Sequence, residues 1–158
     1  DWMPLGVRRA GDAAQGSLLL KVLKREKGKL QELLIEVLSA RKLAAADRGG
    51  TSDPFVVVHA EGQKLKTRVI KATLTPEWGE SFQVAVEEDA GKVTFEVFDY
   101  NTFGRNTHIG TAELDTSSLT PASPPLHKWL PIDMPPAGGG LKSLPKLARV
   151  GGTAYGDL

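Results

Sequence analysis

The chain has 158 residues, of which 41% are hydrophobic and 25% charged, with a formal net charge of +1 and no cysteine. This composition is typical of a globular domain with a sizeable core, and it excludes disulfides, thiolate metal sites and thiol catalysis. Any attraction to an anionic surface must come from local patches, and no apolar run approaches the roughly 18 residues that a membrane-spanning helix needs.

The first 15 residues are polar and loop-like and begin with Asp instead of Met, which indicates a fragment of a longer protein. Trp2-Met3-Pro4-Leu5 is echoed about one sandwich domain later by Trp129-Leu130-Pro131-Ile132. Either this match is chance, or residues 1–15 are an extension that carries the tail of a preceding, similar domain. We therefore divide the chain into this extension, a domain at 16–134, and a Pro/Gly-rich linker or C-terminal extension at 135–158.

Short apolar or alternating runs separated by turn signals predict strands through the middle of the chain. The run 30–40 also fits the 3.6-residue period of a helix, but the strand-like runs that follow require it as a partner. Glu61-Gly62 is typical of a tight hairpin turn, and 24–29 of a charged turn. The strands expected are 17–23, 30–40, 55–60, 63–70, 80–86, 92–98, 108–114 and 127–132. Many short strands favour an antiparallel sandwich.

The first oxygen-rich loop lies between two of these strands. Asp47 and Asp53 flank Gly49-Gly50, and Pro54 begins the extended run that follows. Calcium binds several oxygen ligands at about 2.3–2.6 Å in flexible loops, and glycines allow the turn that brings two carboxylates together. The alternative is that both Asp are ordinary turn residues.

A second oxygen-rich loop follows the alternating run 93–98. It begins with Asp99-Tyr100-Asn101 and continues through Asn106 and Thr107 into another strand-like run. Two acidic loops at strand ends are a stronger indication of a cation site than either loop alone, because calcium prefers several oxygen ligands.

Taken together, these motifs over residues 30–133 resemble a C2 domain. The resemblance implies an eight-stranded antiparallel β-sandwich with Greek-key topology. The family has two circularly permuted strand orders, and eight strands from Gly16 onward fit the order that begins with an extra N-terminal strand. The residues that carry the resemblance are Ala40, Leu43, Asp47, Gly50-Thr51-Ser52-Asp53-Pro54-Phe55-Val56, Lys66-Thr67, Leu74-Thr75-Pro76-Glu77-Trp78, Glu80-Ser81-Phe82, Asp99-Tyr100-Asn101 and Ile109-Gly110.

The resemblance also implies a calcium site built mainly from five acidic positions. Asp47, Asp53 and Asp99 match three of them, while Asn101 and Thr107 stand at the other two. The backbone carbonyls of Ala46 and Tyr100 match further ligand positions. Because calcium affinity depends on the number of charged ligands, three carboxylates predict one weak site, or none at physiological levels. The alternative is a calcium-independent domain whose three Asp serve loop structure.

The apices of the two loops suggest contact with a membrane. Arg48 lies in the first loop, and Phe103 and Arg105 lie in the second. Basic residues attract anionic headgroups, and an exposed Phe inserts at the interface. The alternatives are that Phe103 packs against its own loop and that the arginines are merely solvated.

A second basic patch is expected on the strand 63–70. Lys64, Lys66 and Arg68 alternate, so a regular strand would place them on one face. His59 and Trp78 are candidates to line this face, which in several relatives binds polyphosphate headgroups. The patch therefore suggests a phosphoinositide site, with an ordinary solvated face as the alternative.

The sequence holds no catalytic arrangement: the three His lack metal-ligand spacing, and no phosphate-binding or nucleophile motif is present. We expect no enzyme activity and no nucleic-acid binding in this segment. The resemblance implies a cytoplasmic module, peripheral to membranes, that binds anionic phospholipid in trafficking, tethering or signalling, as in multi-C2 or synaptotagmin-like proteins. The alternatives are a calcium-independent scaffold for other proteins and a regulatory domain of a larger lipid-metabolising or signalling enzyme.

Overall fold

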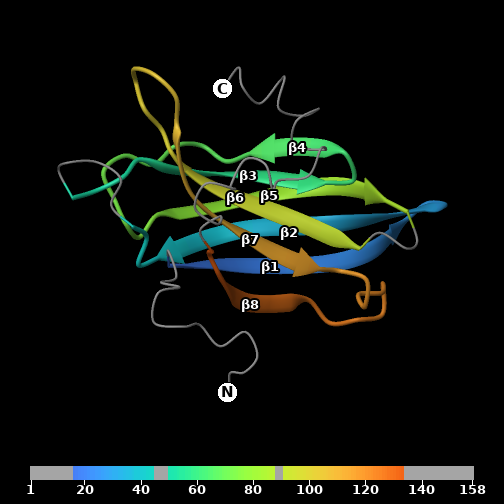
Figure 1. Cartoon of the computed structure of the whole chain (residues 1–158). Coiled ribbons are helices and arrows are strands. Elements are labelled where there is room, and N and C mark those ends of the chain that lie inside the picture. Colours follow the sequence, from blue (N-terminus) through green and yellow to red (C-terminus); the bar gives the residue numbers. More distant parts are fainter. Residues whose placement is uncertain (1–15, 45–49, 88–90, 134–158) are drawn as a thin grey trace.

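A computed structural model describes residues 16–44, 50–87 and 91–133, and these residues form eight β-strands and no helix (Figure 1). The strands are β1 (Ser17–Lys27), β2 (Leu30–Arg41), β3 (Pro54–Ala60), β4 (Gln63–Lys66), β5 (Glu77–Val86), β6 (Lys92–Asp99), β7 (Thr107–Asp115) and β8 (Leu126–Pro131). The extensions at 1–15 and 135–158 lie outside the described residues.

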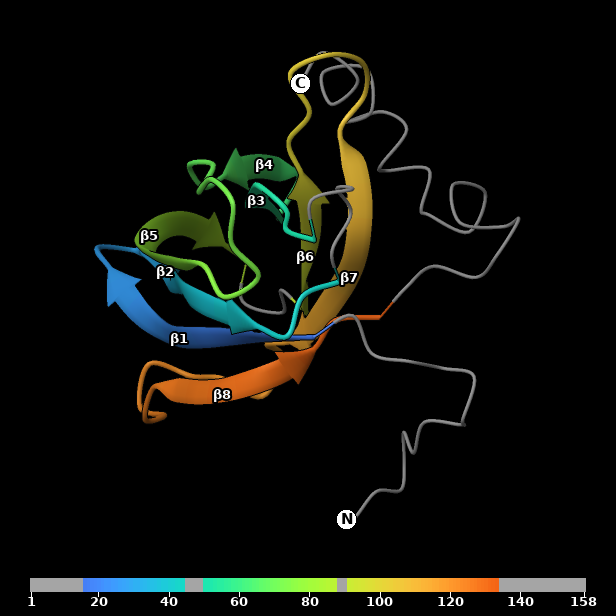
Figure 2. The ribbon, with the colours of Figure 1, turned by 90° about the vertical axis from the view of Figure 1, so that its left-hand side faces the viewer.

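The strands form two four-stranded sheets that pack face to face, as Figure 2 shows. One sheet has the order β5-β2-β1-β8 and the other β4-β3-β6-β7, and the pairings are antiparallel. The expected eight-stranded antiparallel sandwich is confirmed. β1 lies between β2 and β8, so the strand that begins at Ser17 is an integral part of this sandwich.

The β1–β2 hairpin is longer than the sequence suggested. Both strands continue through the charged stretch to a two-residue turn, in which Gly28 has a φ of 64°. Such turns use a positive φ at the first central residue, which glycine adopts without strain. The prediction of a turn spanning 24–29 is therefore wrong in its extent, because the charged side chains lie on paired strands. The helical alternative for 30–40 is also wrong, because these residues form β2, which pairs with β1 and β5.

The β3–β4 connection is the tight hairpin that the sequence predicted. Ala60 pairs with Gln63, which leaves only Glu61 and Gly62 in the turn, with φ values of 51° and 76°. Positive φ at both central residues is the geometry of a type I′ turn, whose twist matches that of paired strands.

Alternating apolar side chains from both sheets form the core. In β1 every second residue from Leu18 to Lys24 is buried, and β2 contributes its inward apolar residues in a similar way. The largest fully buried side chains are Phe95, Leu18, Leu20, Leu33, Ile35, Ile132, Val22, Val37, Val56, Val57, Val58 and Val84. β3 differs because it is buried on both faces: Phe55 and Val57 form a second cluster with Phe98 on the outer side of their sheet.

The two sheets are joined beside β7. Thr111 and Asp133 exchange two backbone hydrogen bonds of 2.8 Å, which place the residues after β8 against the edge of the other sheet. Gly110 permits this approach, because a Cβ there would lie 2.6 Å from Ile132 Cγ2 and 2.9 Å from the Asp133 carbonyl oxygen. The closure therefore requires the absence of a side chain at this position.

Candidate functional site

Asp53 and Asp99 meet where β3 begins and β6 ends. Pro54 pairs with Asp99 in the antiparallel ladder, so the two acidic residues are adjacent although they lie in different loops. The Asp53 backbone N–H donates to Asp99 Oδ1 at 2.7 Å, and the Tyr100 N–H donates to the Asp53 carbonyl at 2.9 Å. Asp99 is fully buried. The structure thus brings together the two acidic positions of the predicted set that it describes.

The Asp53 carboxylate also fixes the connection between β4 and β5. Its Oδ1 accepts a hydrogen bond from the Ala72 N–H at 2.7 Å, and the Thr73 N–H donates to the Ser52 carbonyl at 2.8 Å. Ala72 has a φ of 52°, a left-handed conformation that costs roughly 1–2 kcal/mol for a residue other than glycine. The bond to Asp53 helps to stabilise this strained residue. Asp53 therefore has a structural role that does not depend on a cation.

Asn101 joins the two arms of the β6–β7 loop. Its Nδ2 donates to the Arg105 carbonyl at 2.6 Å and to Thr107 Oγ1 at 3.0 Å. Its backbone N–H donates to Asn106 Oδ1 at 2.9 Å. Because a backbone carbonyl can only accept, the amide nitrogen of Asn101 must be the atom that faces Arg105. Asn101 and Thr107, expected as oxygen ligands, are here bonded to each other.

The donor set accordingly fits a cation only in part. Asp53 and Asp99 are the carboxylates that a hard cation prefers, but Asn101 would have to rotate its amide to present an oxygen. Asp47, Arg48 and the Ala46 carbonyl lie outside the described residues. Within the described ranges, no group of three or more His, Asp or Glu side chains is placed to hold a metal ion. Of the acidic positions, the structure therefore places only Asp53 and Asp99.

Phe103 lies at the apex of the β6–β7 loop with 91% of its surface exposed. Arg105 is also exposed, and Gly104 between them has a φ of 83°. Both views show this loop rising from the body of the sandwich (Figures 1 and 2). The alternative that Phe103 packs against its own loop is therefore wrong. Tyr100 at the start of the loop is 37% exposed, with Lys71 Nζ 6.0 Å from its ring centroid.

Only part of the expected basic patch lies on the face predicted for it. Lys64 pairs with His59 and Lys66 with Val57, which puts both lysines on the outer face of the β4-β3-β6-β7 sheet. The regular backbone pairing of β3 with β4 ends at Thr67. Here the Val56 N–H donates to the Thr67 hydroxyl, at 2.9 Å, and not to a backbone carbonyl. β4 consequently ends at Lys66, earlier than the predicted strand.

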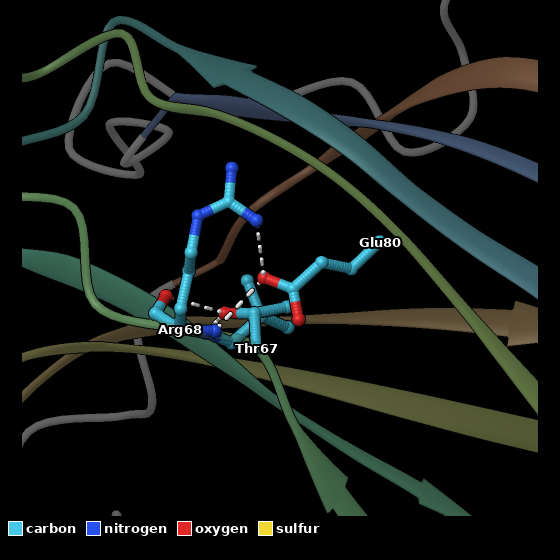
Figure 3. Close-up of polar contacts among 4 residues, drawn as sticks. Thr67, Arg68 and Glu80 are labelled. Carbon is cyan, nitrogen blue, oxygen red and sulfur yellow. Dashed lines mark hydrogen bonds and ion pairs between the residues drawn. The ribbon is translucent and has the colours of Figure 1, made fainter.

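Arg68 points toward the other sheet, as Figure 3 shows. Its guanidinium Nη1 lies 3.2 Å from Glu80 Oε2, and its backbone N–H donates to the same oxygen at 2.9 Å. Val69, which a regular strand would turn inward, packs instead on the outer cluster of Phe55 and Val57. The expectation that Lys64, Lys66 and Arg68 share one face is wrong, because the chain shifts register at Thr67.

Of the two other residues expected to line the basic face, His59 lies on it beside Lys64, whereas Trp78 does not. Trp78 is 2% exposed and packs in the main core, so its ring does not reach this face. His59 Nε2 lies 2.8 Å from Glu96 Oε1, and His108 Nε2 lies 3.6 Å from Glu96 Oε2. Sequence reasoning missed Glu96 and His108. The alternating pattern of β6 could have identified Glu96, because it places this residue on the outer face, opposite Val57.

His108 lies largely buried beside Glu96 and Phe98. Desolvation lowers the pKa of its imidazole below the ordinary value, although the neighbouring Glu96 carboxylate and the Gly110 backbone act in the opposite direction. Its ring also contacts Phe98, with centroids 5.1 Å apart. A buried carboxylate between two imidazoles reduces the positive potential of this face, so the two lysines do not form a simple cationic patch.

Within the described residues, no helix is long and apolar enough to cross a membrane. The profile of the C2 domain family matches residues 31–132 of the chain. This match covers β2 to β8 with both oxygen-rich loops.

Individual proteins show the same similarity. The chain is 42% identical over 85 residues to GTPase activating protein 1 of Oryza sativa subsp. indica and 36% identical over 111 residues to synaptotagmin-5 of Mus musculus. These matches cover 54% and 66% of the chain, but only 50% and 28% of the two relatives. The crystal structure of a C2 domain of RIM from Drosophila superposes with a TM-score of 0.65 at 20% identity, covering 77% of the chain and all of that domain. The superposition shows a shared fold.

Proposed function

The chain belongs to the C2 domain family, and we propose that it is a non-enzymatic, peripheral membrane-targeting module that binds anionic phospholipid through its β6–β7 loop. C2 domains commonly bind membranes or other proteins, and calcium is a common ligand of the family. The observation that carries the proposal is the almost complete exposure of Phe103 at the apex of a projecting loop, beside the exposed Arg105.

The energies of these contacts favour reversible binding. Burying a Phe side chain contributes about 1.5–3 kcal/mol, and a basic residue near an anionic surface contributes about 1 kcal/mol. Phe103 and Arg105 alone would therefore give weak attachment. Lys64 and Lys66 supply additional positive charge on the adjoining sheet face, where a phosphoinositide headgroup is the ligand class that we propose. Reversible attachment is what a peripheral module of the cytoplasmic membrane surface in trafficking, tethering or signalling requires.

Calcium has a reduced role in this proposal. Asp53 and Asp99, together with Asp47 of the preceding loop, supply three carboxylates for one weakly bound ion. A second ion would leave positive charge uncompensated, because Asn101 and Thr107 are neutral. Titration calorimetry at millimolar calcium checks this point: we expect a small heat that Asp99→Asn abolishes and that Asp115→Asn, at the opposite end of the sheet, retains.

The second candidate is a calcium-independent scaffold for other proteins, including a regulatory domain of a larger signalling enzyme. It is favoured by the bond from Asn101 Nδ2 to Thr107 Oγ1, which occupies the Thr107 hydroxyl and turns the nitrogen of the Asn101 amide, not its oxygen, toward the opposite arm. The two candidates differ in what covers Phe103, which is a lipid interface in the first and a protein surface in the second.

Co-sedimentation with vesicles of phosphatidylserine and phosphatidylcholine, with calcium or with chelator, tests the proposal. Phe103→Ala is expected to weaken binding about tenfold, the equivalent of 1.4 kcal/mol. Leu30→Ala is the matched control, because Leu30 is also exposed, at 64%, but lies on the β1–β2 hairpin at the other end of the sandwich. Absence of binding in both conditions, or equal losses in the two variants, would reject the membrane proposal and favour the scaffold.

A further inference from the structure

We propose that Asn101 takes the place of a cation in the β6–β7 loop and is the positioning residue that presents Phe103 without calcium. The inference concerns how the loop is held, and its consequence for membranes rests on the function proposed above. It begins from the three hydrogen bonds that Asn101 makes within the loop, to the Arg105 carbonyl, Thr107 Oγ1 and Asn106 Oδ1.

These bonds join the two arms of the loop at its base. Asn101 lies two residues after the end of β6, whereas Thr107 is the first residue of β7. One amide group donates to oxygens of two different residues on the opposite arm, with N···O distances of 2.6 and 3.0 Å. The segment between them, with Phe103 at its apex, is therefore closed by side-chain bonds at its ends.

An amide and a bound cation can perform this closure in similar ways. A cation draws oxygens from both arms toward a positive centre, and the amide presents two partially positive hydrogens to two oxygens. A carboxylate at position 101 could not do so, because it only accepts hydrogen bonds and would repel the Arg105 carbonyl oxygen at this distance. Asp at this position would require an ion between the arms, whereas Asn does not.

The closure matters for binding because it orders the loop in advance. Ordering a side chain or loop on association costs about 0.5–1.5 kcal/mol for each immobilised group, and a loop that is already held avoids part of this cost. Gly104, with its φ of 83°, provides the turn that leaves Phe103 pointing away from the closed base. Calcium is then unnecessary for presenting the apolar apex, although Asp53 and Asp99 can still bind an ion nearby.

The test compares Asn101→Ala and Asn101→Asp with Thr102→Ala, which changes a neighbour that takes part in none of the three bonds. Backbone 15N order parameters of residues 102–106 are measured in the free domain with chelator. Wild type and Thr102→Ala are expected near 0.85, and both Asn101 variants below about 0.6. Millimolar calcium is expected to restore order in Asn101→Asp but not in Asn101→Ala. Unchanged order in both Asn101 variants would overturn the inference.

Vesicle binding with chelator gives the second measurement. Asn101→Ala, which adds no charge, is expected to weaken binding three- to tenfold, and Thr102→Ala to leave it unchanged. A loosened loop with unchanged binding would overturn the claim that ordering serves membrane attachment. If wild type binds no vesicles but the order parameters change as expected, the proposed function fails while the positioning role of Asn101 stands.

Discussion

Asp99 Oδ1 accepts a hydrogen bond from the Asp53 backbone N–H at 2.7 Å, although 46 residues separate them in sequence. This bond joins the end of β6 to the residue that precedes β3 and places Asp53 beside Asp99. A buried carboxylate at this place therefore serves the fold before any ion binds.

Replacement of Asp99 separates its structural role from its charge. Asp99→Ala removes the acceptor of the partly buried Asp53 N–H, which lowers stability by up to the roughly 1–3 kcal/mol that a fully buried unpaired donor costs. Asp99→Asn keeps an oxygen at the same place, so we expect a smaller loss of stability. Urea unfolding in chelator measures both values. Equal losses in the two variants would contradict the role assigned to the hydrogen bond.

Thr67 determines where the basic strand changes register. Its buried hydroxyl accepts the Val56 N–H at 2.9 Å and donates to the Arg68 carbonyl at 3.0 Å. Thr67→Val keeps the shape but removes both bonds, and we expect the free energy of unfolding to fall by about 1–3 kcal/mol. Thr67→Ser, which retains the hydroxyl, should lose less than half as much. Denaturant titration of the pair checks this, and a Ser variant as unstable as the Val variant would argue against it.

This residue also marks the limit of prediction from sequence. Alternation correctly placed Lys64 and Lys66 on one face, because two-residue periodicity follows directly from strand geometry. It failed at Arg68, because a side-chain hydroxyl replaced a backbone acceptor and ended the regular ladder. Periodicity in the sequence contains no information about such a substitution, so the pairing of Arg68 with Glu80 required the structure.

The strand at 30–41 shows the opposite case. Its helical pattern included Leu30, which is 64% exposed, whereas the strand pattern of Leu33, Ile35 and Val37 matches the buried positions. The alternation of apolar residues within this segment was therefore sufficient to predict a strand. The motifs of the β6–β7 loop likewise indicated an exposed apex, but the bonding of Asn101 depends on distances that spacing alone does not give.

Gly110 is expected to tolerate no side chain. Gly110→Ala would place a Cβ 2.6 Å from Ile132 Cγ2 and 2.9 Å from the Asp133 carbonyl oxygen, where the sheets join. Overpacking of this kind costs about 1–3 kcal/mol, which exceeds the gain of about 0.4–1 kcal/mol from a stiffer unfolded chain. Gly91→Ala is the control, because a Cβ added at Gly91 would have nothing within 4 Å of it. Thermal unfolding should show a lower Tm for Gly110→Ala alone, and equal midpoints would refute the steric argument.

The pH dependence of stability is expected to include a contribution from His108. Burial lowers the pKa of this imidazole in the folded protein, so the unfolded chain binds the proton more readily. The charged and polar groups that contact it are Glu96, 3.6 Å from its Nε2, and the Thr111 hydroxyl at 3.1 Å. Stability is therefore retained above the unfolded pKa of about 6.5 and lost as the pH falls through the lower, folded value.

His108→Gln removes this contribution and should flatten the decline in the free energy of unfolding between about pH 7 and pH 5. His127→Gln is the matched control, because His127 is exposed on β8, and it should keep the wild-type slope. Urea unfolding at a series of pH values gives the slopes. A His108→Gln profile parallel to that of wild type would show that burial of this imidazole has no effect on stability.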